Sequence, residues 1–179
     1  GNEMFTNSDK TNTTLTNENG RIKYENKLDA TVTPPRNITY NFGEFDFTKG
    51  SMLVSFDLTL NQAIKWLNAG SHCFNPQMLL GDKPIGYMPA IETTGLRARD
   101  EKGGRVKTND EKDIMNKGDT VTISTLFTYY PDEKKIGYIQ FADGRRLYNS
   151  TTEEPIPVYY IADADAVINS AASIRFGGR

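Results

Sequence analysis

The chain has 179 residues, and its 21 Lys and Arg nearly balance its 23 Asp and Glu. This near-zero net charge argues against a general nucleic-acid binder, because such a protein needs a basic face. No apolar run approaches the roughly 20 residues of a membrane span, so we expect no membrane insertion. A chain of this length can bury about 70% of its unfolded surface, and it therefore needs no disulfide or metal to hold a core.

The first part of the chain is polar, with Asn, Thr, Ser and charged residues dominating. We expect residues 1–20 to form an arm or linker and residues 21–179 to form a single domain.

The next segments alternate apolar and polar side chains with a period of two, which predicts strands. They cover residues 38–42, a short extended piece at 45–47, and a strong central strand at 51–60. Asn61 can then cap a short helix that ends before Gly70, because apolar residues follow it at helical spacing.

Residues 72–80 return to an extended pattern, and a glycine-rich segment of mixed charge follows at 95–118. This segment is the longest candidate loop. Alternatively, Gly103-Gly104 forms the turn of a solvated mixed-charge hairpin between residues 96–99 and 106–107, and we favour this interpretation.

Residues 119–148 predict an antiparallel meander and identify the fold class better than any other segment. Apolar side chains alternate with Ser and Thr from 121 to 129, residues 131–133 supply a turn, and residues 136–141 form the return strand. Asp143-Gly144 is a tight-turn signal, because Gly tolerates positive φ.

Three further strands are expected at 155–161, 166–168 and 173–176. Strands at roughly ten-residue spacing with turn signals between them favour a sandwich over a parallel α/β fold. The sequence therefore predicts an all-β protein, an antiparallel β-sandwich of the jelly-roll type with one short helix.

Five short motifs resemble those of the concanavalin A-like (laminin G-like, jelly-roll) superfamily over about residues 38–178. They are GSMLVSFDL at 50–58, Gly118-Asp119-Thr120-Val121, Tyr129-Tyr130, IQFADG at 139–144 and IRFGG at 174–178. The resemblance implies a fold and does not imply an activity.

Catalytic and zinc-binding arrangements are incomplete in this chain. Glu44 and Asp46 begin like the Glu-x-Asp-x-x-Glu strand of glucanases that resemble laminarinases, but the third position is Lys49, so the paired-carboxylate mechanism lacks its acid. His72 and Cys73 are the only imidazole and thiol, too few for a zinc site, and on a strand they point to opposite faces. We expect no enzyme activity, with a degenerate glycan hydrolase as one alternative.

A calcium site is a further candidate, with weaker support in the sequence than sugar binding. Asp163 and Asp165 could present two carboxylates on one face, and calcium takes oxygen ligands of this kind. In domains of the resembling superfamily, calcium often lies near the sugar site.

Sugar binding needs aromatic rings and planar polar groups near one rim or face. The Tyr pairs at 129–130 and 159–160 must each turn one ring away from its neighbour, and Asn75 and Gln77 are further polar partners. The candidate ligand-binding residues are Trp66, Tyr87, Arg97, Arg99, Tyr130 and Tyr160.

Together these features favour a non-catalytic recognition domain of a secreted protein at a cell surface or on a virion or phage particle, binding a glycan or a cell-surface receptor. The alternative is a structural or receptor-binding head or appendage domain of a phage or viral fibre. A homo-oligomer is compatible with either function.

Overall fold

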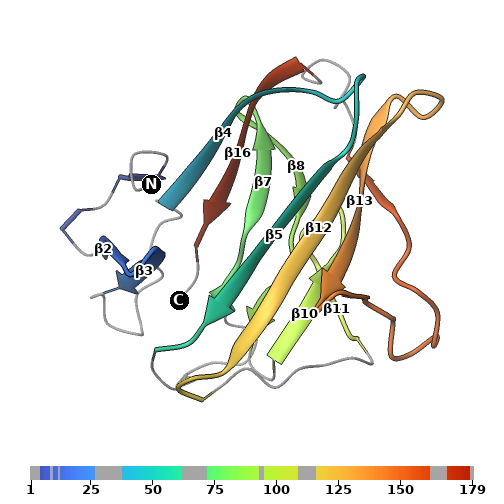
Figure 1. Ribbon diagram of the computed structural model, residues 1–179. Coiled ribbons are helices and arrows are strands. Elements are labelled where there is room, and N and C mark those ends of the chain that lie inside the picture. Colours follow the sequence, from blue (N-terminus) through green and yellow to red (C-terminus); the bar gives the residue numbers. More distant parts are fainter. Residues whose placement is uncertain are drawn as a thin grey trace.

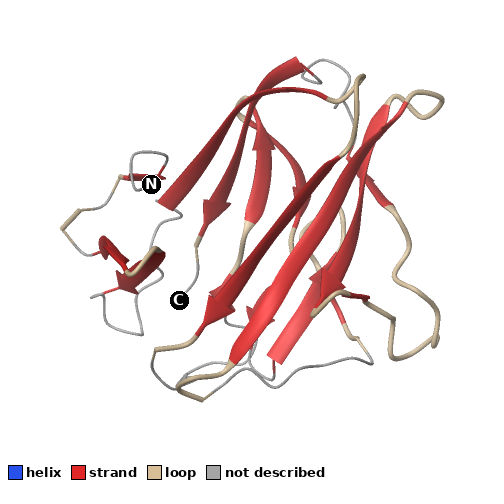
Figure 2. Ribbon diagram, viewed as in Figure 1, coloured by secondary structure: helices blue, strands red, loops and turns tan. Residues whose placement is uncertain are grey.

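The computed structural model describes residues 5–8, 10–11, 13–26, 38–61, 72–92, 95–108, 116–161 and 169–177. These residues contain strands and no helix (Figure 2). The expected short helix and the strand expected at 166–168 lie outside them. In chain order the strands are β1 (Phe5–Asn7), β2 (Thr13–Glu18), β3 (Arg21–Asn26), β4 (Ile38–Asp46), β5 (Met52–Thr59), β6 (His72–Phe74), β7 (Gln77–Leu80), β8 (Lys83–Tyr87), β9 (Ala90–Glu92), β10 (Gly95–Arg99), β11 (Arg105–Val106), β12 (Thr120–Tyr130), β13 (Lys135–Ala142), β14 (Arg145–Arg146), β15 (Tyr159–Ile161) and β16 (Asn169–Phe176).

Two antiparallel sheets make the body of the molecule. The first sheet has the order β1-β4-β16-β7-β8, and the second has the order β14-β13-β12-β5, with β15 also paired to β13. A third sheet of order β11-β10-β9-β6 and a hairpin of β2 and β3 complete the described strands. In Figure 1 the second sheet lies in front of the first. The protein is an all-β antiparallel sandwich of the jelly-roll type, as the sequence predicts.

The core lies between the two main sheets. Val121, Ile123 and Phe127 of β12 have no exposed surface, and they face Met78 and Ile85 of the first sheet in one apolar cluster. Because side chains alternate along a strand, the same pattern that buries these residues turns Thr122, Ser124 and Thr128 away from the core.

The meander and the central strand are confirmed. β12 pairs with β13 from Ile123 opposite Ala142 to Tyr130 opposite Lys135, and with β5 along all eight residues of that strand. Asp143 has a φ of 49°, in the left-handed region that a tight turn requires.

Some strand boundaries differ from those expected. The two short pieces expected at 38–42 and 45–47 are one strand, β4, with a bulge at Gly43, whose φ of 86° suits a residue without Cβ. The strand expected at 155–161 is only β15, and residues 155–158 have two prolines, which cannot donate to a sheet ladder.

The hairpin across Gly103-Gly104 is confirmed, with Ala98 opposite Val106. Asp100 Oδ1 accepts the backbone N–H of Gly104 at 2.6 Å and closes the turn. The expectation of a solvated hairpin is wrong on the β10 side, because all five residues of β10 are buried.

The N-terminal residues carry structure of their own. β1 pairs with β4, and β2 pairs with β3 around a turn at Asn19 and Gly20. The boundary expected between residues 20 and 21 falls at this turn.

Candidate functional site

A row of polar and aromatic side chains crosses the first sheet. Thr39 of β4 lies opposite Arg175 of β16, Arg175 opposite Gln77 of β7, and Gln77 opposite Tyr87 of β8. Residues directly opposite each other on neighbouring antiparallel strands share one face of the sheet. We call Thr39, Arg175, Gln77 and Tyr87 the polar row.

The polar row is on the face that points away from the core. The neighbouring positions on β16, β7 and β8 are Ile174, Met78 and Gly86, and the first two belong to the core cluster. A Cβ placed on Gly86 would lie 2.7 Å from Phe127 and 2.8 Å from Tyr138, so this side of β8 contacts the second sheet. The alternating positions, which form the polar row, therefore face outward.

Direct contacts organise the polar row. Arg175 Nη2 donates to Gln77 Oε1 at 2.6 Å, and Gln77 is only 3% exposed. The guanidinium carbon of Arg99 lies 5.5 Å from the centre of the Tyr87 ring, within cation–π range. The row thus combines an aromatic ring with planar amide and guanidinium groups.

Two polar atoms, one in this row and one beside it, are buried and have no hydrogen-bond partner in the protein. They are Oδ1 of Asn75 and Nε of Arg175. Asn75 is two residues before Gln77, and its backbone N–H donates to the carbonyl of Gly177 at 2.6 Å, which extends the pairing of β7 with the C-terminal strand. An unpaired buried acceptor and an unpaired buried donor lie on adjacent chain segments, and such groups are rare in proteins.

A buried hydrogen-bond network ties Arg99 to the second sheet. The Arg99 N–H donates to Gln140 Oε1 at 2.9 Å, while Gln140 Nε2 at 2.9 Å and the Tyr138 hydroxyl at 3.1 Å both donate to the Arg99 carbonyl. Burial raises the pKa of Tyr138, and the carboxylates of Asp100 and Glu101 raise it further. This network fixes β10 against β13 and so sets the position of Arg99.

Arg97 and Arg99 are almost fully buried, as Asn75 and Gln77 are. They are 5% and 4% exposed, and Arg97 Nη1 donates to the carbonyl of Leu96 at 3.0 Å. Alternation with the core residues Leu96 and Ala98 indicates that both arginines point away from the core, but it does not reveal their burial. Their role as ligand-binding residues stays a prediction.

The two tyrosine pairs divide as expected. Tyr129 and Tyr159 pack against the core, whereas Tyr130 and Tyr160 contact each other with ring centres 5.2 Å apart. Their contact lies over Gly137, where an added Cβ would be 2.7 Å from the Tyr130 ring. Tyr130 and Tyr160 are therefore on the outer face of the second sheet.

The predicted ligand-binding residues consequently fall into two groups. Tyr87 and Arg99 meet beside the first sheet, and Tyr130 and Tyr160 meet on the second, so the structure does not bring the two groups together. Trp66 and the calcium candidates Asp163 and Asp165 lie outside the described residues. Within the described part of the chain, no three His, Cys, Asp or Glu side chains are grouped as metal ligands would be.

Sequence reasoning missed Arg175 and Thr39, because the strands at 38–42 and 173–176 were interpreted mainly through their apolar positions. A usable signal existed: Arg175 stands between Ile174 and Phe176, so alternation alone places it on the face opposite the core.

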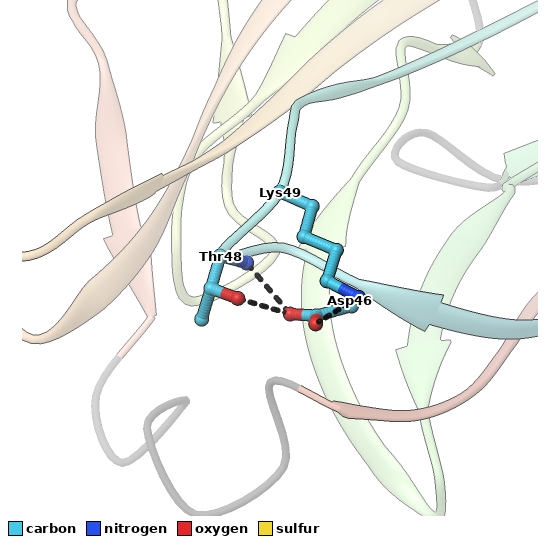
Figure 3. A network of polar contacts seen from close by, with 3 residues as sticks. All are labelled: Asp46, Thr48 and Lys49. Atoms are coloured by element: carbon cyan, nitrogen blue, oxygen red, sulfur yellow. Dashed lines mark hydrogen bonds and ion pairs between the residues drawn. The ribbon is translucent and has the colours of Figure 1, made fainter.

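Of the two candidate catalytic carboxylates, Glu44 and Asp46, Asp46 has a structural role. Asp46 Oδ1 accepts the backbone N–H of Thr48 at 2.9 Å and its hydroxyl at 2.5 Å, and Lys49 Nζ lies 3.8 Å from Oδ2 (Figure 3). The hydrogen bond from the Thr48 hydroxyl is the largest of the interactions that lower the pKa of Asp46. Asp46 closes the turn after β4, and Glu44 is exposed.

Comparison with known proteins finds similarity in structure and none in sequence family. No protein-family model matches this chain, and no curated protein matches it. Among solved structures, the T. cruzi calreticulin globular domain is similar, with a TM-score of 0.50 and 12% sequence identity over 99% of this chain and 81% of that one. The likeness shows the fold alone. It agrees with the antiparallel β-sandwich that the sequence predicts.

The described part of the chain has no helix with the length and apolar character needed to span a membrane.

Proposed function

We propose that this chain is a non-catalytic recognition domain that binds glycan through the polar row of the first sheet, as part of an extracellular, cell-surface or particle-borne protein. The observation that carries the proposal is the pair of buried, unpartnered atoms, Asn75 Oδ1 and Arg175 Nε, beside a row that already contains amide, guanidinium and aromatic groups.

Sugar hydroxyls suit this pair of atoms chemically. A hydroxyl both donates and accepts, so one hydroxyl can donate to Asn75 Oδ1 while a neighbouring one accepts from Arg175 Nε. A buried polar group without a partner costs about 1–3 kcal/mol. Because both atoms have almost no accessible surface, a ligand recovers part of that cost only when the side chains covering them move aside. The Tyr87 ring adds an apolar surface of the kind against which sugar rings pack.

The carboxylates support a binding role over catalysis. A retaining glycosidase pairs a carboxylate nucleophile with a carboxylic acid of raised pKa, and the lowered pKa of Asp46 does not suit the acid. Asp46 Oδ1 also accepts two hydrogen bonds from Thr48 in the turn after β4.

Replacement of Asn75 by leucine tests the proposal. A glycan array on the wild-type protein first identifies a binding oligosaccharide, and titration calorimetry then measures its Kd. Asn75→Leu removes Oδ1 without breaking a hydrogen bond of that oxygen, so the free energy of unfolding should stay the same or rise by up to about 1 kcal/mol. The Kd should rise by about tenfold or more.

Thr125→Val is the matched control. Thr125 Oγ1 is also buried without a partner, but the residue is on the core-facing side of β12 and has no exposed surface. This variant should change stability in the same direction as Asn75→Leu and leave the Kd unchanged. Absence of binding to any oligosaccharide on the array would remove the proposed function, and an equal loss of affinity in both variants would remove its assignment to the polar row.

A further inference from the structure

Among the described strands, β5 is the last of the second sheet, and one of its edges has no partner there. All eight of its residues, Met52–Thr59, pair with β12 without a register shift, and no described strand pairs with the opposite edge. Figure 1 shows β5 at the margin of the front sheet. Arg21 of the hairpin donates to Thr59 Oγ1 at 3.1 Å, so the free edge runs from Met52 to Leu58.

The core is incompletely covered along this edge. Met52, Phe56 and Leu58 of β5 pack against the core but stay partly exposed, whereas Val121, Ile123 and Phe127 of β12 have no exposed surface. On the other face of β5, Leu53 is 63% exposed and is the most exposed large hydrophobic residue in the described part of the chain. An additional strand beside β5 would cover all four side chains.

β5 also lacks the features that usually protect an edge strand from pairing. Such strands are commonly shortened, bulged, covered or charged. At the margin of the first sheet, β4 is covered by β1 and has its bulge at Gly43. β5 has no bulge and no proline, and Asp57 is its only charged residue. A free edge of this kind is a ready template for another extended strand.

We propose that β5 of a second copy of this chain pairs with β5 in an antiparallel, two-fold symmetric arrangement centred on Phe56. Every register centred on a residue keeps like faces together, and Ser55 and Phe56 lie near the middle of the free edge. Centring on Ser55 would place Leu53 opposite Asp57 of the other copy, whereas centring on Phe56 places Ser55 opposite Asp57 and Val54 opposite Leu58.

The register centred on Phe56 is chemically self-complementary. On the core face it pairs apolar residues with apolar residues. On the outer face, on each side of the axis, it places Ser55 opposite Asp57 and Leu53 opposite Thr59. Asp57 never lies opposite its own copy, so like charges are not directly opposed. An isologous contact of this kind closes at two copies, so the second sheets of both protomers become one continuous sheet.

This interface uses the edge of the second sheet and leaves the polar row on the first sheet free. The inference therefore does not depend on the proposed function. If both hold, the dimer would present two ligand sites and gain avidity for a repeating ligand.

Light scattering after size-exclusion chromatography tests the oligomer, and a charge swap tests the register. The wild-type protein should be a dimer. Ser55→Asp places a carboxylate opposite Asp57 at two points and should raise the dimer dissociation constant about tenfold. Adding Asp57→Lys turns both repulsive pairs into attractive ones and should restore the dimer. Thr120→Asp, the matched control, adds the same charge to an exposed position of β12 and should leave the dimer intact.

Cross-linking gives a second measurement that does not depend on the charge variants folding well. Ser55→Cys combined with Asp57→Cys, in a Cys73→Ser background, should yield a disulfide-linked dimer on oxidation, because opposed residues of paired strands have Cα atoms within disulfide range. A monomer or a trimer at 100 µM protein (a concentration on the order of the dissociation constants of weak dimers) would overturn the proposal. Failure of the charge swap to restore the dimer, or failure to cross-link, would overturn the register.

Discussion

Replacement of Gln140 by methionine should show how much one buried side-chain amide, which anchors β10, contributes to the free energy of unfolding. Gln140 holds both backbone groups of Arg99, at 2.9 Å each, and the Tyr138 hydroxyl shares the carbonyl at 3.1 Å. All three residues are buried, so water cannot replace a lost partner easily. Methionine has a similar volume, which keeps the effect of packing small.

The magnitudes follow from which group loses its partner. Gln140→Met takes the buried N–H of Arg99 away from its acceptor, at about 1–3 kcal/mol, and removes one of two hydrogen bonds to the carbonyl, at about 0.5–1.5 kcal/mol. Tyr138→Phe removes only the second hydrogen bond to that carbonyl and should cost about 0.5–1.5 kcal/mol. In the double variant both side-chain donors to the carbonyl are lost, so the total should exceed the sum of the single effects by about 1 kcal/mol.

Urea unfolding of the four proteins, followed by circular dichroism, measures this double-mutant cycle. The slope of unfolding free energy against urea should be the same in all four, since the fold is unchanged. Additive effects within about 0.3 kcal/mol would refute the reasoning, because they would mean that the two donors do not share the carbonyl in solution. A cost below about 0.5 kcal/mol for Gln140→Met would refute it as well.

Three further outcomes follow from single contacts. Gly86→Ala inserts a Cβ 2.7 Å from a fully buried ring and should destabilise the protein by about 1–3 kcal/mol, measured as a lower Tm. Tyr138 and Tyr159 have raised pKa values, chiefly from burial, so both should stay protonated in the native protein where ordinary tyrosines ionise. Because the unfolded state loses these protons first, stability present below pH 10 should fall as the pH rises above it, and absorbance at 295 nm should report the two missing phenolates until unfolding. Thr48→Ala should raise the pKa of Asp46 toward its ordinary value, measured by NMR titration, since the hydroxyl that lowers it is gone.

Alternation of side chains carried the prediction of the fold. The period-two pattern of β12 and β13 identified the meander, and it divided Tyr129 from Tyr130 and Tyr159 from Tyr160 correctly. The same pattern could not reveal the bulge at Gly43, because a glycine between two apolar stretches is equally typical of a turn between separate strands.

The polar row was only partly predictable for a related reason. Sequence reasoning selected Tyr87, Arg99 and Gln77 by residue type, but it could not show that they lie side by side with Arg175, which is 98 residues from Gln77. That proximity depends on the strand order β16-β7-β8, a property of the whole fold. Burial of the two arginines of β10 was also invisible, because it depends on packing beyond their own strand.

The two sheets differ in how their outer faces treat polar groups, and this difference favours the first sheet as the ligand site. On the second sheet, hydroxyls of β12 pair with hydroxyls on or beside β5 at 2.8–2.9 Å and satisfy one another; the pairs are Ser51–Thr128, Ser55–Ser124 and Thr59–Thr120. Groups paired in this way gain little from a ligand, because a new hydrogen bond would replace an existing one. Asn75 Oδ1 and Arg175 Nε have no such partner, so a ligand that reached them would replace no existing hydrogen bond. The second sheet is left with a free edge and an exposed apolar residue, Leu53, which suit another strand better than a sugar.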